Sequence, residues 1–149
     1  MAEVLFYHLT ERTLEQVLPG LVEKCLERQW RAVIQAGSRE RLEAIDSLLW
    51  TFREDSFLPH AMERDGSEHQ HPVWLTTEGD NPNQSQVRFL VDGAVPPDLG
   101  AYLRGVYLFD GHDADALSQA RERWKAERAA GHDVTYWQQA VSGRWEKRV

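Results

Sequence analysis

This chain of 149 residues has little of what secreted or membrane-bound proteins need. Its single cysteine, Cys25, cannot form an internal disulfide, and we expect it to be a reduced, buried apolar side chain on a helix. No apolar run approaches the roughly 20 residues that a membrane-spanning helix requires. The opening residues, MAEVLFYHLTER, lack the basic start and the cleavage site of a signal peptide. The sequence therefore predicts a cytoplasmic protein.

Glycine is missing where a nucleotide-binding enzyme would need it. The loop that follows the first predicted strand, Thr10–Thr13, contains none. A dinucleotide-binding fingerprint or a P-loop uses glycines there so that backbone N–H groups can approach phosphate, and the P-loop adds a lysine. Glu11 would repel phosphate from this position. A nucleotide-binding α/β enzyme of unknown reaction therefore stays a minor alternative.

Other catalytic and metal-binding patterns are incomplete. His60, His69 and His71 are close in sequence, but a structural zinc site usually takes four ligands and the chain has no second cysteine. The acidic residues between 110 and 115 precede a predicted helix, where they favour capping, and they lack the twelve-residue pattern of a calcium loop. No serine lies in a nucleophile elbow. We therefore expect no catalytic residue, no metal and no cofactor.

The formal net charge of −7 argues against broad, sequence-independent binding of nucleic acid, which needs a basic surface. The charge is spread unevenly, however. Residues 1–119 contain 10 lysines and arginines against 20 acidic residues, whereas residues 120–149 contain 7 against 4. This asymmetry favours a local acidic partner. A direct DNA-binding protein remains a second alternative.

Length and composition, with 42% hydrophobic and 28% charged residues, predict one globular domain over residues 1–149. Short apolar runs alternate with amphipathic segments in the order β-α-β-α-β-β-α-β-α. The predicted strands are Glu3–Leu9, Trp30–Ala36, Val73–Thr76, Val87–Val91 and Gly105–Phe109, and the predicted helices are Leu14–Gln29, Arg39–Phe52, Asp98–Leu103 and Ala114–Ala130. This order favours an α/β three-layer sandwich, with a largely parallel, Rossmann-like sheet and helices on both faces.

Three segments carry weaker signals. Pro19 and Gly20 interrupt the first helical pattern and predict either a kink or a helix that begins near Pro19. Residues 61–72 are polar and lack periodicity, which predicts a loop. The tail, from about residue 133 to 149, contains several aromatic residues and is expected to dock as a short helix.

The helix predicted at Ala114–Ala130 carries two stripes. Its apolar side is spaced to pack against a sheet and comprises Ala116, Leu117, Ala120 and Trp124. A cationic edge of Arg121, Lys125 and Arg128 lies beside that side and predicts a site for an acidic partner with an apolar tip. The alternative is a solvated helix face on which Glu122 and Glu127 neutralise the cations.

A second unexplained feature is Trp50. It projects well away from the apolar face of the helix predicted at Arg39–Phe52, and the following segment adds Phe57 and Leu58. Aromatic side chains outside the core face of a helix either anchor a partner or are covered by the following loop. Both interpretations stay open.

Nearly the whole chain resembles the chi subunit of bacterial DNA polymerase III holoenzyme. The most specific match is Leu48-Leu49-Trp50 followed by Ser56-Phe57-Leu58-Pro59-His60. The helix motif of the family matches Ala120-Arg121-Glu122-Arg123-Trp124-Lys125 with Gly131 after it, and the remaining matches are Phe6-Tyr7, Trp30 and Val33-Ile34. The chain departs from better-known members in the loop 61–85 and in a longer tail after Gly131.

The resemblance implies a non-catalytic accessory subunit of the clamp-loader assembly in DNA replication. Chi proteins pair with a psi subunit and bind the acidic, Phe-ended C-terminal tail of single-stranded-DNA-binding protein, so they meet nucleic acid only indirectly. Carried over to this sequence, the tail-binding residues are Arg121, Trp124, Lys125 and Arg128. The surface that faces psi falls on Trp50, Phe57 and Leu58.

Overall fold

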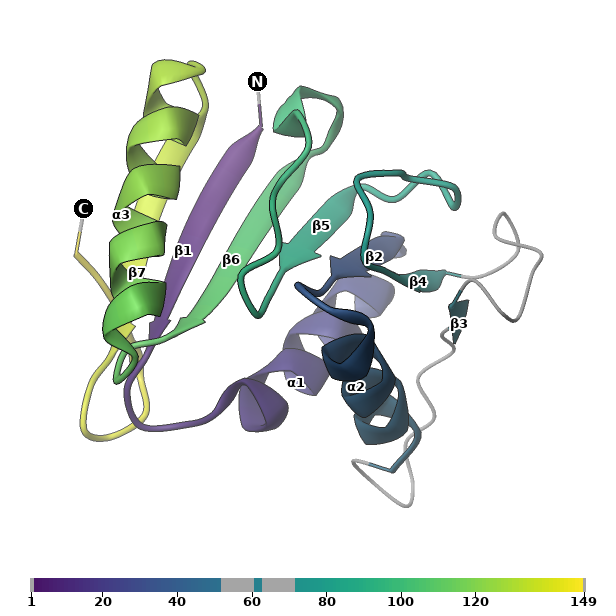
Figure 1. Ribbon diagram of the computed structural model, residues 1–149, viewed down its shortest axis with the longest axis horizontal. Helices are drawn as coiled ribbons and strands as arrows, with labels where there is room; N and C mark the ends of the chain where they lie inside the picture. The colour runs from purple at the N-terminus through teal and green to yellow at the C-terminus, as the bar shows by residue number, and fades with distance from the viewer. Residues whose placement is uncertain (1, 52–60, 63–71, 149) are drawn as a thin grey trace.

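The computed structural model describes residues 2–51, 61–62 and 72–148 (Figure 1). Within these residues, eight strands form one sheet in the order β3-β4-β2-β5-β6-β1-β7-β8, and every neighbouring pair is parallel except the antiparallel pair β7–β8. The strands are β1 (Glu3–Leu9), β2 (Ala32–Gln35), β3 (Ala61–Met62), β4 (Val73–Thr76), β5 (Val87–Leu90), β6 (Arg104–Asp110), β7 (Asp133–Gln139) and β8 (Trp145–Lys147). The helices are α1 (Leu14–Glu27), α2 (Arg39–Thr51), α3 (Ala114–Ala129) and the short 3₁₀ helix η3 (Leu99–Ala101).

Helices cover both faces of the sheet (Figure 1). One core lies under α1 and α2 and includes Leu18, Val22 and Leu42 with Ile34 of β2. The other lies under α3 and η3 and includes Phe6 of β1. The predicted α/β architecture, with a largely parallel sheet between two helical layers, is confirmed.

The two cores explain why the central strands are largely apolar. Leu5 and Leu9 of β1 point toward the face of α1, whereas Val4 and Phe6 point toward α3, and all four are buried. A strand buried on both faces has no polar side to alternate with. This pattern allowed the bounds of β1 and β4 to be predicted from the sequence.

Helix α1 begins at Leu14 and continues through Pro19, so of the two predicted alternatives, a kink or a start near Pro19, the second is wrong. Thr13 and Gln16 form a capping box that fixes the start: the backbone N–H of each donates to the side chain of the other, at 2.9 and 3.3 Å. Pro19 is buried in the helix. The helix therefore takes its beginning from the cap and not from the proline.

The tail from about residue 133 is not a short helix, which corrects our prediction. It forms β7, parallel to β1, and β8, antiparallel to β7. Val134, Thr135, Tyr136 and Trp137 are β-branched or aromatic, the residue types that fit a pleated surface, and β1 would otherwise leave unpaired N–H and C=O groups at the sheet edge. Residues 61–62, within a predicted loop, form β3.

An arginine lies in the middle of a strand predicted to be apolar. Arg88 of β5 is fully buried, and its guanidinium donates twice to Gln35 Oε1, at 3.0 and 2.7 Å, and once to the Tyr102 hydroxyl, at 2.9 Å. It also donates to the backbone oxygens of Glu78 and Asp80. These bonds satisfy the buried charge and tie two loops to the sheet.

Candidate functional site

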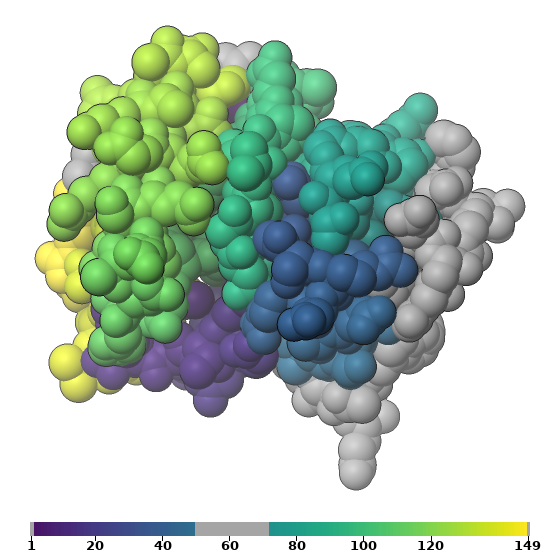
Figure 2. Space-filling model, viewed as in Figure 1, coloured from purple at the N-terminus to yellow at the C-terminus, as the bar shows by residue number. Residues whose placement is uncertain are grey.

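Helix α3 has well-defined ends. The Asp113 side chain accepts hydrogen bonds from the backbone N–H groups of Asp115 and Ala116, at 2.9 and 3.2 Å, and so caps the first turn. Gly131 follows the last turn with a φ of +87°, a conformation that favours glycine at a helix end. The helix lies on the surface of the molecule along its length, as Figure 2 shows in green. One side of it packs on the sheet and the other faces solvent.

The inner side of α3 is more polar than its sequence predicted. Glu127 is buried beside Ala120, and its Oε2 accepts a 2.7 Å hydrogen bond from the Tyr107 hydroxyl of β6. Burial and this hydrogen bond raise the pKa of Tyr107 well above its usual value. Glu127 therefore belongs to the core and cannot neutralise the cationic edge. Its position three residues after Trp124 and seven after Ala120 placed it on the apolar side, and that spacing was the available signal.

The outer side of α3 carries the predicted cations, and we call Arg121, Trp124, Lys125 and Arg128 the α3 edge. The three cations are exposed. Lys125 Nζ lies 3.8 Å from Glu122 Oε1, with both side chains about three-quarters exposed (74% and 73%). Within the described part of the chain, Arg121 and Arg128 form no ion pair. The edge is therefore only weakly neutralised, because exposed pairs of this kind contribute little.

Trp124 is half-buried between the core and these cations. Its ring meets the rings of Phe6 and Tyr136 edge to face, with centroids 5.7 and 5.9 Å apart. The guanidinium carbon of Arg128 lies over the Trp124 ring, 5.7 Å from its centroid. The core thus holds the indole in place while part of it stays accessible beside Arg128.

The sequence did not place Tyr136 at this site. Strand β7 brings it next to Trp124, and its hydroxyl lies 2.7 Å from His8 Nδ1 of β1. Burial raises the pKa of Tyr136, and the nearby charge of Arg121 opposes this shift. Tyr136 therefore adds a second half-buried aromatic ring to the α3 edge. Because the two residues are far apart in sequence and on different elements, no local pattern could have predicted the pair.

The second predicted surface lies mostly outside the described residues. Leu42, Ile45 and Leu49 are buried and form the core face of α2. Trp50 belongs to the last turn of this helix, but its side chain, like Phe57 and Leu58, falls outside what the structure describes. The grouping of Trp50, Phe57 and Leu58 therefore stays a prediction.

A groove of about 780 Å³ lies where β1, β5 and β6 end, next to the first turns of α3 (Figure 2). Open α/β sheets commonly hold ligands at this edge. Here the backbone N–H groups of Thr10, Glu11 and Arg12 all donate to Gln139 Oε1, at 3.2, 3.1 and 3.0 Å. In a phosphate-binding loop such groups would face the ligand. Their use by a buried glutamine argues against a nucleotide site.

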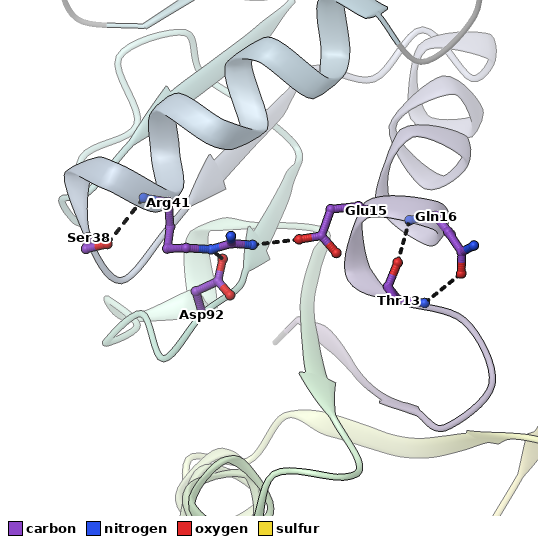
Figure 3. Close-up of polar contacts among 6 residues, drawn as sticks. All are labelled: Thr13, Glu15, Gln16, Ser38, Arg41 and Asp92. Carbon is purple, nitrogen blue, oxygen red and sulfur yellow. Dashed lines mark hydrogen bonds and ion pairs between the residues drawn. The ribbon is translucent and has the colours of Figure 1, made fainter.

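An arginine at the rim of this groove is also occupied. Arg41, at the start of α2, reaches between Glu15 of α1 and Asp92 after β5 (Figure 3). Its Nη2 lies 2.8 Å from Glu15 and its Nε 3.0 Å from Asp92. The hydrogen bond from Arg41 is the main cause that lowers the pKa of Glu15. This contact joins three elements and does not leave Arg41 free for a ligand.

The described residues contain no group of three or more His, Cys, Asp and Glu side chains arranged to hold a metal ion. They also contain no helix that is long and apolar enough to cross a membrane.

Comparison with known proteins gives consistent matches. Residues 1–135 match the family described as "DNA polymerase III chi subunit, HolC". A "Probable DNA polymerase III subunit chi" of Rickettsia prowazekii is 26% identical over 104 residues, which cover 70% of this chain and 61% of that relative. A "DNA polymerase III subunit chi" of Haemophilus influenzae is 24% identical over 133 residues, which cover 87% of this chain and 92% of the relative.

Proposed function

This chain belongs to the DNA polymerase III chi subunit family, and we propose that it is a non-catalytic accessory subunit of the clamp-loader assembly that binds two partners. The first is a psi subunit, bound through Trp50, Phe57 and Leu58. The second is the acidic C-terminal tail of single-stranded-DNA-binding protein, bound at the α3 edge. The chain would thus connect the polymerase assembly to protein-coated DNA without contacting the DNA itself.

One observation carries the second part of this proposal: weakly neutralised cations lie beside an aromatic ring that the core holds in place. Arg121 and Arg128 form no ion pair among the described residues. Of the two acidic residues that could neutralise the edge, Glu122 and Glu127, the second is bound to Tyr107 in the core. Trp124 supplies a half-buried apolar surface beneath Arg128. An acidic peptide with a terminal phenylalanine matches both the charge and the apolar surface.

The mechanism follows from the chemistry of the tail. Its carboxylates and free C-terminus accept hydrogen bonds from Arg121, Lys125 and Arg128, and its terminal ring packs beside Trp124. Charge-assisted hydrogen bonds contribute about 1.5–3 kcal/mol each. After the cost of ordering a flexible peptide, two or three such bonds and one apolar contact give a dissociation constant of about micromolar. Because the cations are exposed, we expect added salt to weaken binding.

The test is a titration with a synthetic acidic peptide that ends in phenylalanine. We expect Arg121→Ala and Lys125→Ala each to weaken binding by about tenfold or more, which corresponds to the loss of one charge-assisted contact. Arg39→Ala is the matched control, because Arg39 is an exposed arginine on α2. Equal affinities for wild type and both α3-edge variants would remove the tail-binding assignment.

The psi surface has its own test. Trp50→Ala should abolish co-purification with a psi subunit while circular dichroism stays unchanged, because the aromatic side chain is proposed to contact the partner. Retained co-purification would contradict the assignment of Trp50.

The two alternatives predict different results. A direct DNA-binding protein would bind an oligonucleotide at physiological salt without any partner protein, and we expect no such binding. A nucleotide-binding enzyme would show a thermal shift with ATP or NAD. We expect none, because Gln139 occupies the N–H groups at the end of β1.

A further inference from the structure

We propose that a groove between helix α1 and strand β1, here called the α1 groove, binds an acidic segment of a partner protein by taking up one bulky apolar side chain. The groove has a volume of about 190 Å³. It lies on the face of the sheet opposite to α3. It is therefore separate from the α3 edge, and the inference does not rest on the proposed function.

The layout of the helices leaves this groove open. Helices α1 and α2 pack on one face over β2, β4 and β6, whereas the helix packed along β1 and β7 is α3, on the other face (Figure 1). On the face that carries α1, no described helix packs over β1, and the groove lies there beside α1. The register of β1 with β6 places Leu5 beside Val106, and these two residues form part of the groove.

The inside of the groove is apolar. Leu5, Val106 and Phe89 come from the sheet, and Leu21 and Cys25 come from α1. Burial raises the pKa of the Cys25 thiol to about 11, so the thiol is neutral at physiological pH and acts as part of the apolar wall. A cavity of about 150 Å³ suffices to hold a benzene molecule. The α1 groove therefore has room for one aromatic or large aliphatic side chain.

The rim of the groove is cationic. Lys24 and Arg28 of α1 and Arg104 of β6 line it, and no described carboxylate does. Arg104 pairs with Glu3 at 3.6 Å, whereas Lys24 and Arg28 are exposed and form no ion pair within the described part of the chain, so both can meet an anion. In a chain of net charge −7, this local excess of positive charge selects an acidic partner.

The geometry favours a peptide over single-stranded nucleic acid. Nucleic-acid platforms present open aromatic faces on which successive bases stack. Here the guanidinium carbons of Arg28 and Arg104 lie over Trp30, 5.0 and 5.2 Å from its ring centroid. Tyr7 packs edge to face with Trp145, with centroids 4.7 Å apart. The rings around the groove are already in contact with other side chains, and what stays open is a pocket for one side chain.

The test uses a seven-residue peptide with phenylalanine in the middle, three acidic residues on each side and both ends blocked. Blocking the C-terminus separates this probe from the free-ended tail proposed for the α3 edge. We expect fluorescence anisotropy at low salt to show a dissociation constant of about 100 μM. Replacing the phenylalanine of the peptide by serine should weaken binding by about tenfold, because the apolar contact is lost.

Protein variants locate the site. Lys24→Glu and Arg28→Glu should each weaken binding about tenfold, since each replaces an attraction by a repulsion. Arg39→Glu, an equal change of charge on α2, should leave the affinity within about twofold. Circular dichroism checks that each variant is folded. Equal affinities for Lys24→Glu, Arg28→Glu and Arg39→Glu would overturn the proposal.

Cys25 provides a readout inside the groove. It is the one cysteine of the chain, so the rate at which a small thiol reagent alkylates the protein reports this position alone. Saturating peptide should slow alkylation at least about threefold, because only the minority of molecules without peptide can react. The serine peptide at the same concentration should leave the rate unchanged. An unchanged rate, or stronger protection by a single-stranded oligonucleotide, would contradict peptide binding at the α1 groove.

Discussion

The two sides of helix α3 place charged residues in opposite environments. On the inner side, Glu127 is buried and holds the Tyr107 hydroxyl at 2.7 Å. On the outer side, one residue further along, Arg128 is exposed, its guanidinium lies over the ring of Trp124, and it forms no ion pair among the described residues. Removing the partner of a buried charged group lowers the stability of the fold substantially. An exposed cation without an ion pair is instead available to bind another molecule. On this helix, burial and not charge distinguishes the residue that stabilises the fold, Glu127, from the residue that can bind a partner, Arg128.

Substitutions of the neighbouring residues Glu127 and Arg128 should differ most in their effect on the free energy of unfolding. Glu127→Ala should lower the free energy of unfolding by about 2 kcal/mol, because it leaves the buried Tyr107 hydroxyl without its acceptor. Arg128→Ala should change it by less than about 0.5 kcal/mol, as is usual for surface substitutions. Urea unfolding followed by circular dichroism measures both values. If both variants lost the same stability, the two sides of α3 would not differ as described.

The buried hydroxyl of Tyr107 on the inner side of α3 should make the stability of the protein depend on pH. The pKa of Tyr107 is raised in the folded protein. The contribution of this residue to the free energy of unfolding is therefore fully present below the unfolded pKa of about 10 and is lost progressively as the pH rises above that value. The unfolded chain then releases a proton that the folded chain keeps. For each pH unit above 10, the Tyr107 hydroxyl should lower the free energy of unfolding by about 1.4 kcal/mol.

The measurement is urea unfolding of wild type and Tyr107→Phe at pH 9 and pH 11. The other tyrosines with raised pKa values, Tyr7 and Tyr136, are present in both proteins and cancel in the difference. We expect wild type to lose about 1.4 kcal/mol more than Tyr107→Phe between these pH values. Equal losses would mean that Tyr107 is not protected from ionisation by the inner side of α3.

The two sides of α3 differ in how much of them the sequence could predict. The cationic edge was visible because Arg121, Lys125 and Arg128 follow the period of one helix, and helix periodicity is a local property. Tyr107 and Tyr136 come from strands that are adjacent to α3 only in space, and the bond of Tyr107 to Glu127 requires that the sheet be assembled first. The position of Glu127 on the apolar side of the helix indicates that it has a buried partner, but it does not indicate which residue that partner is.

The fold shows a similar limit. Strand β1 was predicted with its bounds because a strand buried on both faces is apolar along its length. Strand β7 lies in the tail for which a short helix was predicted, although its β-branched and aromatic residues also suit a strand. What makes it a strand is the free edge of β1, to which Val134 and Tyr136 pair in register with Val4 and Phe6. Such pairing depends on a segment more than a hundred residues away.

Glu122 tests the outer half of the comparison with the smallest expected effect. Its carboxylate lies 3.8 Å from Lys125, and both side chains are about three-quarters exposed (73% and 74%). Glu122→Gln keeps the size of the side chain and removes its charge, so stability should change by less than about 0.5 kcal/mol. The same change frees Lys125 and makes the α3 edge more positive. Binding of the acidic, Phe-ended peptide should therefore tighten about twofold to threefold at low salt, and this gain should vanish at high salt. A loss of affinity in Glu122→Gln would show instead that the ion pair positions Lys125 for the peptide. This exposed pair would then have a structural role, which we assign only to the buried contact of Glu127 on the inner side of α3.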